Sequence, residues 1–170
     1  MERGRSGAAR ARRKQRGAAV VEFAVIAPFI VMLVIGVAQF GWYLANYAVV
    51  ASAASTGARY FAAQRGVSQP YSLTQSTVSA TMATLSVVTG NVVVTSFVND
   101  TQCASMAIGA SGASTGDSTC ATALSAAQGG SSTVTVTYSF APFLKSFAFG
   151  LASGASSMIT ASVSVNARVE

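Results

Sequence analysis

The sequence predicts an α+β protein in which a long N-terminal helix precedes a small antiparallel sheet. Two observations carry this prediction. The segment from Phe23 to Ala58 contains no charged residue, and its first half is almost wholly apolar, which is typical of a membrane-spanning helix. Near the other end of the chain, apolar and polar residues alternate over 133–140 and again over 159–169, which is the pattern of half-buried strands.

The N-terminal helix is expected to cross a membrane with its first half. Crossing a bilayer takes about 20 helical residues, and the stretch from Ala18 to about Tyr43 supplies them. Trp42 and Tyr43 stand where aromatic side chains meet the membrane interface. Residues 46–65 lack proline and are rich in alanine, so a single helix is predicted over 18–66, half in lipid and half outside it.

The distribution of charge predicts the topology. The protein has 11 lysine and arginine residues and a net charge of +6. Seven of these basic residues precede Gly17: Arg3, Arg5, Arg10, Arg12, Arg13, Lys14 and Arg16. Basic residues collect on the cytoplasmic side of a membrane helix. A single-pass protein is therefore predicted, with a cytoplasmic leader over 1–17 and an extracytoplasmic domain over 67–170.

The rest of the composition argues against several classes of function. From Ala18 onward the basic and acidic residues cancel, which gives that part of the chain no electrostatic reason to bind nucleic acid. The protein has no histidine and only five acidic residues, which are far apart. No catalytic residue, metal site or cofactor is therefore predicted. Cys103 and Cys120 match neither a redox pair nor a zinc-ligand spacing, so a disulfide is the expected use in an exported chain.

The extracytoplasmic domain is predicted to begin at the break over 66–70. A helix is expected over 72–88 and a strand over 91–98, whereas the Ser- and Gly-rich stretch over 101–132 is expected to be a loop tethered by the disulfide, which would add about 3 kcal/mol. The strands over 133–140 and 159–169 are expected to pair in one antiparallel sheet. The apolar connection over 142–149 would cover the core or contact a partner or the membrane surface.

Small residues recur along the second half of the helix at three- and four-residue spacing. They are Ala51, Ala54, Ser55, Ala58 and Ala62. Such a face allows another helix to pack closely. The plainer alternative is an alanine-rich stalk with no packing partner.

A short motif joins the basic leader to the apolar run: Gly17 is followed by Ala18-Ala19-Val20-Val21 and then by Glu22. This motif resembles a type IV prepilin processing site. The resemblance implies that a membrane aspartyl peptidase cuts after Gly17, so that Ala18 begins the mature chain and Glu22 is its fifth residue. Because glycine has no side chain, a protease can hold its backbone extended and close to the catalytic groups.

Glu22 needs an explanation of its own. A carboxylate drawn to the centre of a bilayer costs up to about 2.5 to 3.5 kcal/mol, so Glu22 is expected to find a partner. The new amino group of Ala18, four residues earlier on the same helical face, would serve, and so would the amino group of a neighbouring subunit. The alternative is that Glu22 lies at the headgroup level near the positive end of the helix, where an anion is favoured.

Longer stretches of the sequence resemble the TadE/TadG-like family of tight-adherence pilus systems. They are GAAVVEFAVIAP at 17–28, GVAQFG at 36–41, ASTGARY at 54–60 and YSFAP at 138–142. Gln39 departs from the family, whose members often carry an acid there. The resemblance implies a pilin-like fold and a non-enzymatic pseudopilin. Its partners would be prepilin peptidase, other pilin or pseudopilin subunits, the inner-membrane pilus machinery and membrane lipid.

Two other interpretations remain open at this stage. The chain could be an uncleaved signal anchor that displays a small adhesin or binding module. It could instead be a secretory protein cut by signal peptidase near Ala51-Ser52-Ala53, although the apolar region exceeds the 7 to 15 residues of a signal-peptide core. Within the pilus interpretation, the sequence does not separate a filament subunit from a priming component or an assembly factor.

Overall fold

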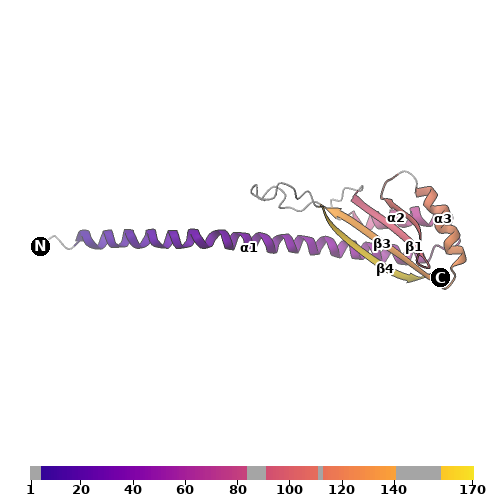
Figure 1. Ribbon diagram of the computed structural model, residues 1–170, viewed down its shortest axis with the longest axis horizontal. Helices are drawn as coiled ribbons and strands as arrows, with labels where there is room; N and C mark the ends of the chain where they lie inside the picture. Colours follow the sequence, from indigo (N-terminus) through magenta and orange to yellow (C-terminus); the bar gives the residue numbers. More distant parts are fainter. Residues whose placement is uncertain (1–4, 84–90, 111–112, 141–157) are drawn as a thin grey trace. The chain divides into compact units, whose positions relative to one another are not determined.

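A computed structural model describes residues 5–83, 91–110, 113–140 and 158–170 (Figure 1). The elements are α1 (Arg5–Ala62), α2 (Pro70–Met82), β1 (Val92–Val98), β2 (Thr101–Ala107), α3 (Ala113–Ala126), β3 (Ser131–Phe140) and β4 (Ile159–Arg168). This confirms the predicted α+β class with its long N-terminal helix. The chain divides into two compact units, residues 1–42 and residues 43–170. We call the second unit the C-terminal domain.

The C-terminal domain is built on one antiparallel sheet with the strand order β2-β1-β3-β4. The predicted pairing of the last two strands is confirmed, since β3 and β4 run side by side from the pair Ser131 and Arg168 to the pair Phe140 and Ile159. The strand predicted over 91–98 is also present, as β1. It pairs with β2 on one side and with β3 on the other.

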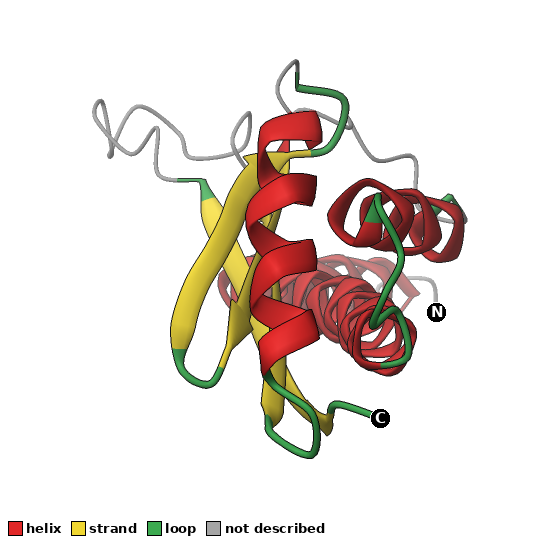
Figure 2. Cartoon of the chain, turned by 90° about the vertical axis from the view of Figure 1, so that its right-hand side faces the viewer, coloured by secondary structure: helices red, strands yellow, loops and turns green. Residues whose placement is uncertain are grey.

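Helices α2 and α3 and the second half of α1 cover one face of this sheet (Figure 2). Alternate residues of the central strands point toward them, and among these Val94, Val134 and Val136 are fully buried. The core between the sheet and the helices is apolar and takes side chains from all four strands, as the alternation of buried and half-buried residues along β1 and β3 requires. The sequence pattern of the strands thus fixes which face is covered.

The second half of α1 belongs to this core. Its buried side chains recur every three or four residues: Val50, Ala53, Ala54, Ala58, Phe61 and Ala62. This spacing places them on one face of the helix. The compact C-terminal unit thus includes the second half of α1 from Tyr43 onward, together with the predicted range of 67–170. The physical reason is that a single sheet with one apolar face needs helices to cover it, and α1 supplies one of them.

The expectation of a loop over 101–132 is wrong, because this stretch contains β2 and α3. Asn99 and Asp100 have φ angles of 48° and 62°, and Val98 pairs with Thr101 across them. This is a two-residue hairpin turn, whose positive φ angles favour Asn, Asp and Gly. The turn returns the chain directly along β1, so a strand must follow it.

The helix predicted over 72–88 is α2, which begins at Pro70 and ends at Met82. Proline is favoured in the first turn of a helix because its missing N–H is not needed there. Val78 and Met82 are buried in the core, whereas Leu73 is half-buried. Residues 84–90 and the apolar connection over 142–149 lie outside the described residues.

Candidate functional site

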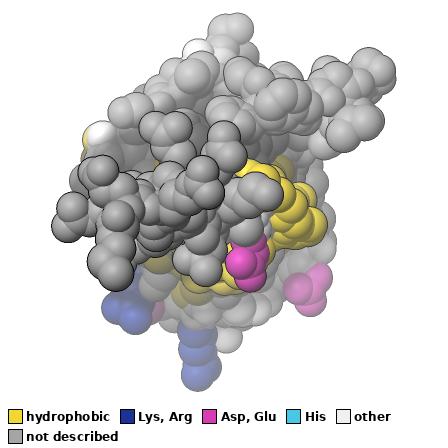
Figure 3. Space-filling model, turned by 90° about the vertical axis from the view of Figure 1, so that its left-hand side faces the viewer, with side chains coloured by type: hydrophobic (Ala, Val, Ile, Leu, Met, Phe, Trp, Pro, Cys, Tyr) yellow, Lys and Arg dark blue, Asp and Glu magenta, His cyan; other side chains and the backbone are white. Residues whose placement is uncertain are grey.

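The first part of α1 is the candidate membrane anchor. By length and composition, Ala19–Ala62 contains the one helical stretch of the described chain that could cross a membrane, and its mean hydropathy reaches 2.7. Among the described residues its apolar side chains are exposed: the exposed fractions of Phe29, Met32 and Leu33 are 71%, 76% and 67%. A bilayer is an apolar medium that suits such a row of side chains. Figure 3 views the molecule from the left-hand side of Figure 1. It shows a group of hydrophobic side chains (yellow) with an acidic side chain (magenta) beside it.

The residues of the predicted processing site lie within α1. The helix begins at Arg5 and ends at Ala62, so it extends further toward the N-terminus than the predicted range of 18–66 and ends earlier. Gly17, Ala18 and Glu22 are part of its continuous course. Glu22 is exposed and stands about one turn after Ala18, hence on the same face. The side-chain surroundings of Gly17 and Ala18 are outside what the structure describes.

The small-residue face of the helix packs inside the protein. Ala54 and Ala58 are fully buried in the core of the C-terminal domain and Ala62 is 4% exposed, whereas Ala51 and Ser55 are half-buried. The buried face is turned slightly from the predicted one, because it also includes the larger Val50 and Phe61. This part of α1 is therefore covered by its own domain, and three of the five small residues have no surface left for a partner helix.

Gly57 lies at a close contact between α1 and α2. A Cβ atom at position 57 would lie 2.7 Å from Cγ2 of Val78 and 3.7 Å from Cγ1 of Val134. Real Cβ atoms almost never come this near another heavy atom, so the contact between the two helices requires glycine. The sequence alone does not indicate this contact.

The opposite side of α1 stays on the surface of the C-terminal domain. A shallow depression there is lined by Ser55, Thr56, Arg59, Tyr60 and Ala63. Arg59 and Tyr60 are both exposed. Within the described residues, this side of the helix is the part of the domain's α1 that a second protein could reach.

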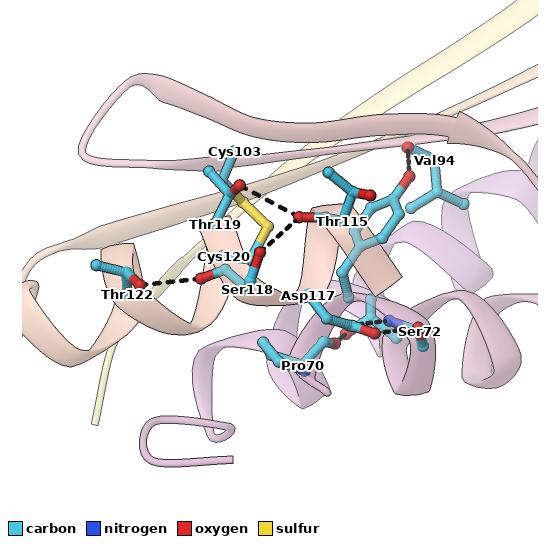
Figure 4. The surroundings of a disulfide bond; sticks show 12 residues. Pro70, Ser72, Val94, Cys103, Thr115, Asp117, Ser118, Thr119, Cys120 and Thr122 are labelled. Atoms are coloured by element: carbon cyan, nitrogen blue, oxygen red, sulfur yellow. Dashed lines mark hydrogen bonds between the residues drawn. A yellow bond between two sulfur atoms is a disulfide. The ribbon is translucent and has the colours of Figure 1, made fainter. Parts of the chain in front are cut away.

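Helix α3 is tied to the rest of the domain at two points (Figure 4). Cys120 on α3 forms a disulfide with Cys103 on β2, 17 residues earlier. Asp117, which is 4% exposed, accepts a hydrogen bond of 2.7 Å from the backbone N–H of Ser72 and another from its hydroxyl. A carboxylate at a helix N-terminus satisfies N–H groups that have no partner within the helix. Asp117 thus caps α2 from a neighbouring helix, since Gln69 at its N-cap forms no side-chain cap.

Tyr71 connects α2 to both the sheet and α3. Its hydroxyl donates a hydrogen bond of 2.6 Å to the carbonyl oxygen of Val94 and accepts one of 3.2 Å from Gln75. A Cβ atom at Gly116 would lie 3.0 Å from its ring, so α3 crosses close over it. Burial raises the pKa of the Tyr71 phenol above its ordinary value, and the group therefore acts as a neutral hydrogen-bond donor.

Replacing both cysteines by serine is expected to lower the free energy of unfolding by about 3 kcal/mol, because the loop between them is then unconstrained in the unfolded chain. Chemical denaturation of the full-length protein in detergent micelles measures this difference. Ser118→Ala, on the exposed side of α3, is the matched control and should change the midpoint little. Equal midpoints for the double cysteine variant and the control would contradict this role.

The side chains described above pack helices against the sheet and join the elements of the domain. No group of three or more His, Cys, Asp or Glu side chains in the described residues could hold a metal ion. Cys103 and Cys120 are consumed in the disulfide. Asp117 is occupied as a helix cap. The fold and the site define a class of protein with one candidate membrane helix that continues directly into a small α+β domain.

The comparison with known families narrows this class. A family model described as TadE-like protein matches residues 17–59, about a quarter of the chain. The resemblance to the TadE-like family is thus confirmed over this segment, which begins at Gly17 and includes most of the apolar helix. The match implies involvement in a tight-adherence pilus system, and this family is one of structural pilus-assembly proteins. No curated protein and no solved structure matches the chain.

Proposed function

We propose that this chain is a non-enzymatic, prepilin-like membrane protein that takes part in the assembly of a tight-adherence pilus, as a minor pseudopilin or an assembly factor. The observation that carries the proposal is the start of the TadE-like match at Gly17. This residue directly follows the seven basic residues and precedes the apolar helix. The family resemblance and the local charge pattern therefore point to the same peptide bond.

Processing would take place on the cytoplasmic side of the membrane. The basic leader over 1–17 would hold the bond between Gly17 and Ala18 at that side, within reach of prepilin peptidase. The C-terminal domain would then lie outside the cytoplasm, where a disulfide such as Cys103–Cys120 persists. The disulfide and the charge pattern thus support the same orientation.

The burial of α1 limits how subunits could contact one another. The second half of the helix packs in its own domain through Ala54, Gly57 and Ala58. Contacts with other pilin subunits would therefore use the exposed apolar residues over 19–42 and the outward side of α1 near Arg59 and Tyr60. Glu22 would register these subunits by pairing with the amino group of Ala18 of its own chain or of a neighbour.

The burial of α1 also weighs against the secretory alternative. Cleavage near residues 51–53 would remove Asn46 and Val50, which are 5% and 0% exposed in the C-terminal domain. Losing a buried valine with its whole helical turn would leave a cavity and expose the core. The uncleaved signal anchor remains the second candidate, because the domain would keep α1 complete in that case too.

Glu22→Leu is expected to leave insertion and processing intact but to lower the number of pili by at least about tenfold, which corresponds to losing about 1.4 kcal/mol of association per subunit. The measurement counts pili by electron microscopy in the native host and follows the processed chain by immunoblot. Glu170→Gln is the control, since it removes an acid far along the chain. Normal piliation with Glu22→Leu would contradict the pairing role.

A further inference from the structure

The face of the sheet that points away from the helices is polar. Residues directly opposite each other on neighbouring strands share a face, and the register places Ser105, Thr95, Thr135 and Ser164 in one row across all four strands. These hydroxyls bond in pairs, Thr95 with Ser105 at 2.8 Å and Thr135 with Ser164 at 2.7 Å. In this row the hydroxyl groups therefore bond to one another across neighbouring strands.

The next row along the same face is different. It consists of Gln102 on β2, Phe97 on β1, Thr133 on β3 and Asn166 on β4. Gln102 and Asn166 are exposed, and Phe97 and Thr133 are half-buried. Within the described residues, the side chains of Gln102, Thr133 and Asn166 form no hydrogen bond. An aromatic ring is thus placed among three polar side chains whose donors and acceptors are free.

The chemistry of this row, which we call the Phe97 row, selects an uncharged ligand. It contains no ionisable side chain, and the charged residues nearest to it in the register, Asp100 in the hairpin turn and Arg168 on β4, have opposite signs. Amides both donate and accept hydrogen bonds, which suits vicinal hydroxyls. The face of Phe97 suits an apolar C–H surface. A sugar ring presents both kinds of group.

The dimensions of the row favour a chain of sugars over a single one. Neighbouring strands lie about 4.8 Å apart, so the row extends about 14 Å across the sheet. The four side chains lie in line, which suits an extended polymer. Apart from Phe97, the apolar side chains on this face are small to medium, such as Val93, and they offer little of the aromatic and apolar core that protein interfaces use.

We propose that the Phe97 row is a binding site for a linear, neutral polysaccharide, with Phe97 stacking on a sugar ring and with Gln102 and Asn166 bonding its hydroxyls. This inference goes beyond the proposed role in pilus assembly. It rests on the sheet alone and is independent of whether the chain is cleaved after Gly17.

The test uses the full-length chain in phosphocholine micelles, because detergents with sugar headgroups would compete. Cello-, chito- and malto-hexasaccharides are titrated while amide chemical shifts are recorded. Saturable shifts centred on Phe97 and Thr133, with a millimolar Kd for at least one of the three sugars, are expected. Phe97→Leu, which keeps an apolar side chain, should weaken binding about tenfold. Gln102→Ala, on the exposed edge strand, should weaken it severalfold.

Val93→Ala is the matched control, since Val93 lies on the same strand and face and should leave binding unchanged. Three results would overturn the proposal. The first is that none of the neutral sugars gives saturable shifts. The second is that Phe97→Leu binds as tightly as the unchanged protein. The third is that only an anionic galacturonate oligomer binds and that Arg168→Gln abolishes its binding.

Discussion

Gly57→Leu is expected to lower the free energy of unfolding of the C-terminal domain by about 3 kcal/mol, because it forces a side chain into a filled space. Even the Cβ atom would lie 2.7 Å from Cγ2 of Val78, and Val78 is fully buried behind it. This loss of stability would be informative because glycine is a poor helix former. At a free position in a helix the same change would stabilise the protein by up to about 1 kcal/mol.

Gly41→Leu provides the matched control, since a Cβ atom there meets nothing within 4 Å. Unfolding in micelles, followed by the near-ultraviolet circular dichroism of the tyrosines, compares the two variants. Combining Gly57→Ala with Val78→Ala should recover part of the stability that Gly57→Ala alone loses, because the second change removes the clashing methyl group. Indistinguishable unfolding midpoints for Gly57→Leu and Gly41→Leu would contradict the close contact between α1 and α2.

Tyr71→Ala is expected to destabilise the same domain by about 4 kcal/mol. The change removes a fully buried ring, and removing a buried aromatic side chain typically costs about 3 to 5 kcal/mol. It also leaves the carbonyl oxygen of Val94 without the hydrogen bond of 2.6 Å that the phenol donates. Tyr71→Phe separates the two effects and should cost about 1 to 2 kcal/mol.

Tyr60→Ala is the control for Tyr71→Ala. Tyr60 is 41% exposed on the outward side of α1, so its removal should change the stability by about 0.5 kcal/mol or less. Denaturant titrations of the three variants give the comparison directly. If Tyr60→Ala proves as costly as Tyr71→Ala, the assignment of Tyr71 as the residue that joins α2, α3 and the sheet is wrong.

The strands and the candidate membrane helix could be predicted from the sequence because their signals are local. In the last two strands every second residue is apolar, and this alternation by itself states which side chains are buried. The apolar run over 23–37 likewise needs no tertiary context. The hairpin turn at Asn99 and Asp100 is also a local signal, and β2 could have been predicted from it.

The role of the second half of α1 could not be read in the same way. Small residues at three- and four-residue spacing fit an intermolecular helix pair and an intramolecular core equally well. The choice between them depends on the apolar face of a sheet whose first strand begins 30 residues after α1 ends. Gly57 shows the same difficulty. It is required because of its contact with Val78, and no sequence pattern links the two residues.

The candidate functional residues also fall into two groups: those in a local sequence motif and those brought together only by the fold. Gly17 and Glu22 can be proposed from the sequence, because a processing motif is linear and lies next to a charge boundary. Asp117 was not assigned, because the N-terminus that it caps belongs to a helix 45 residues away. The Phe97 row was also missed, since its four residues come from four strands and meet only through the register.

The N-terminal residue of the mature protein tests the central claim most directly. The protein is purified from its native membrane, and its intact mass and N-terminal sequence are determined, together with those of Gly17→Ala. A chain that starts at Ala18, and that stays uncleaved in Gly17→Ala, is the predicted result. A chain that starts at Met1 or Glu2, or near Ala54, would contradict prepilin processing at Gly17.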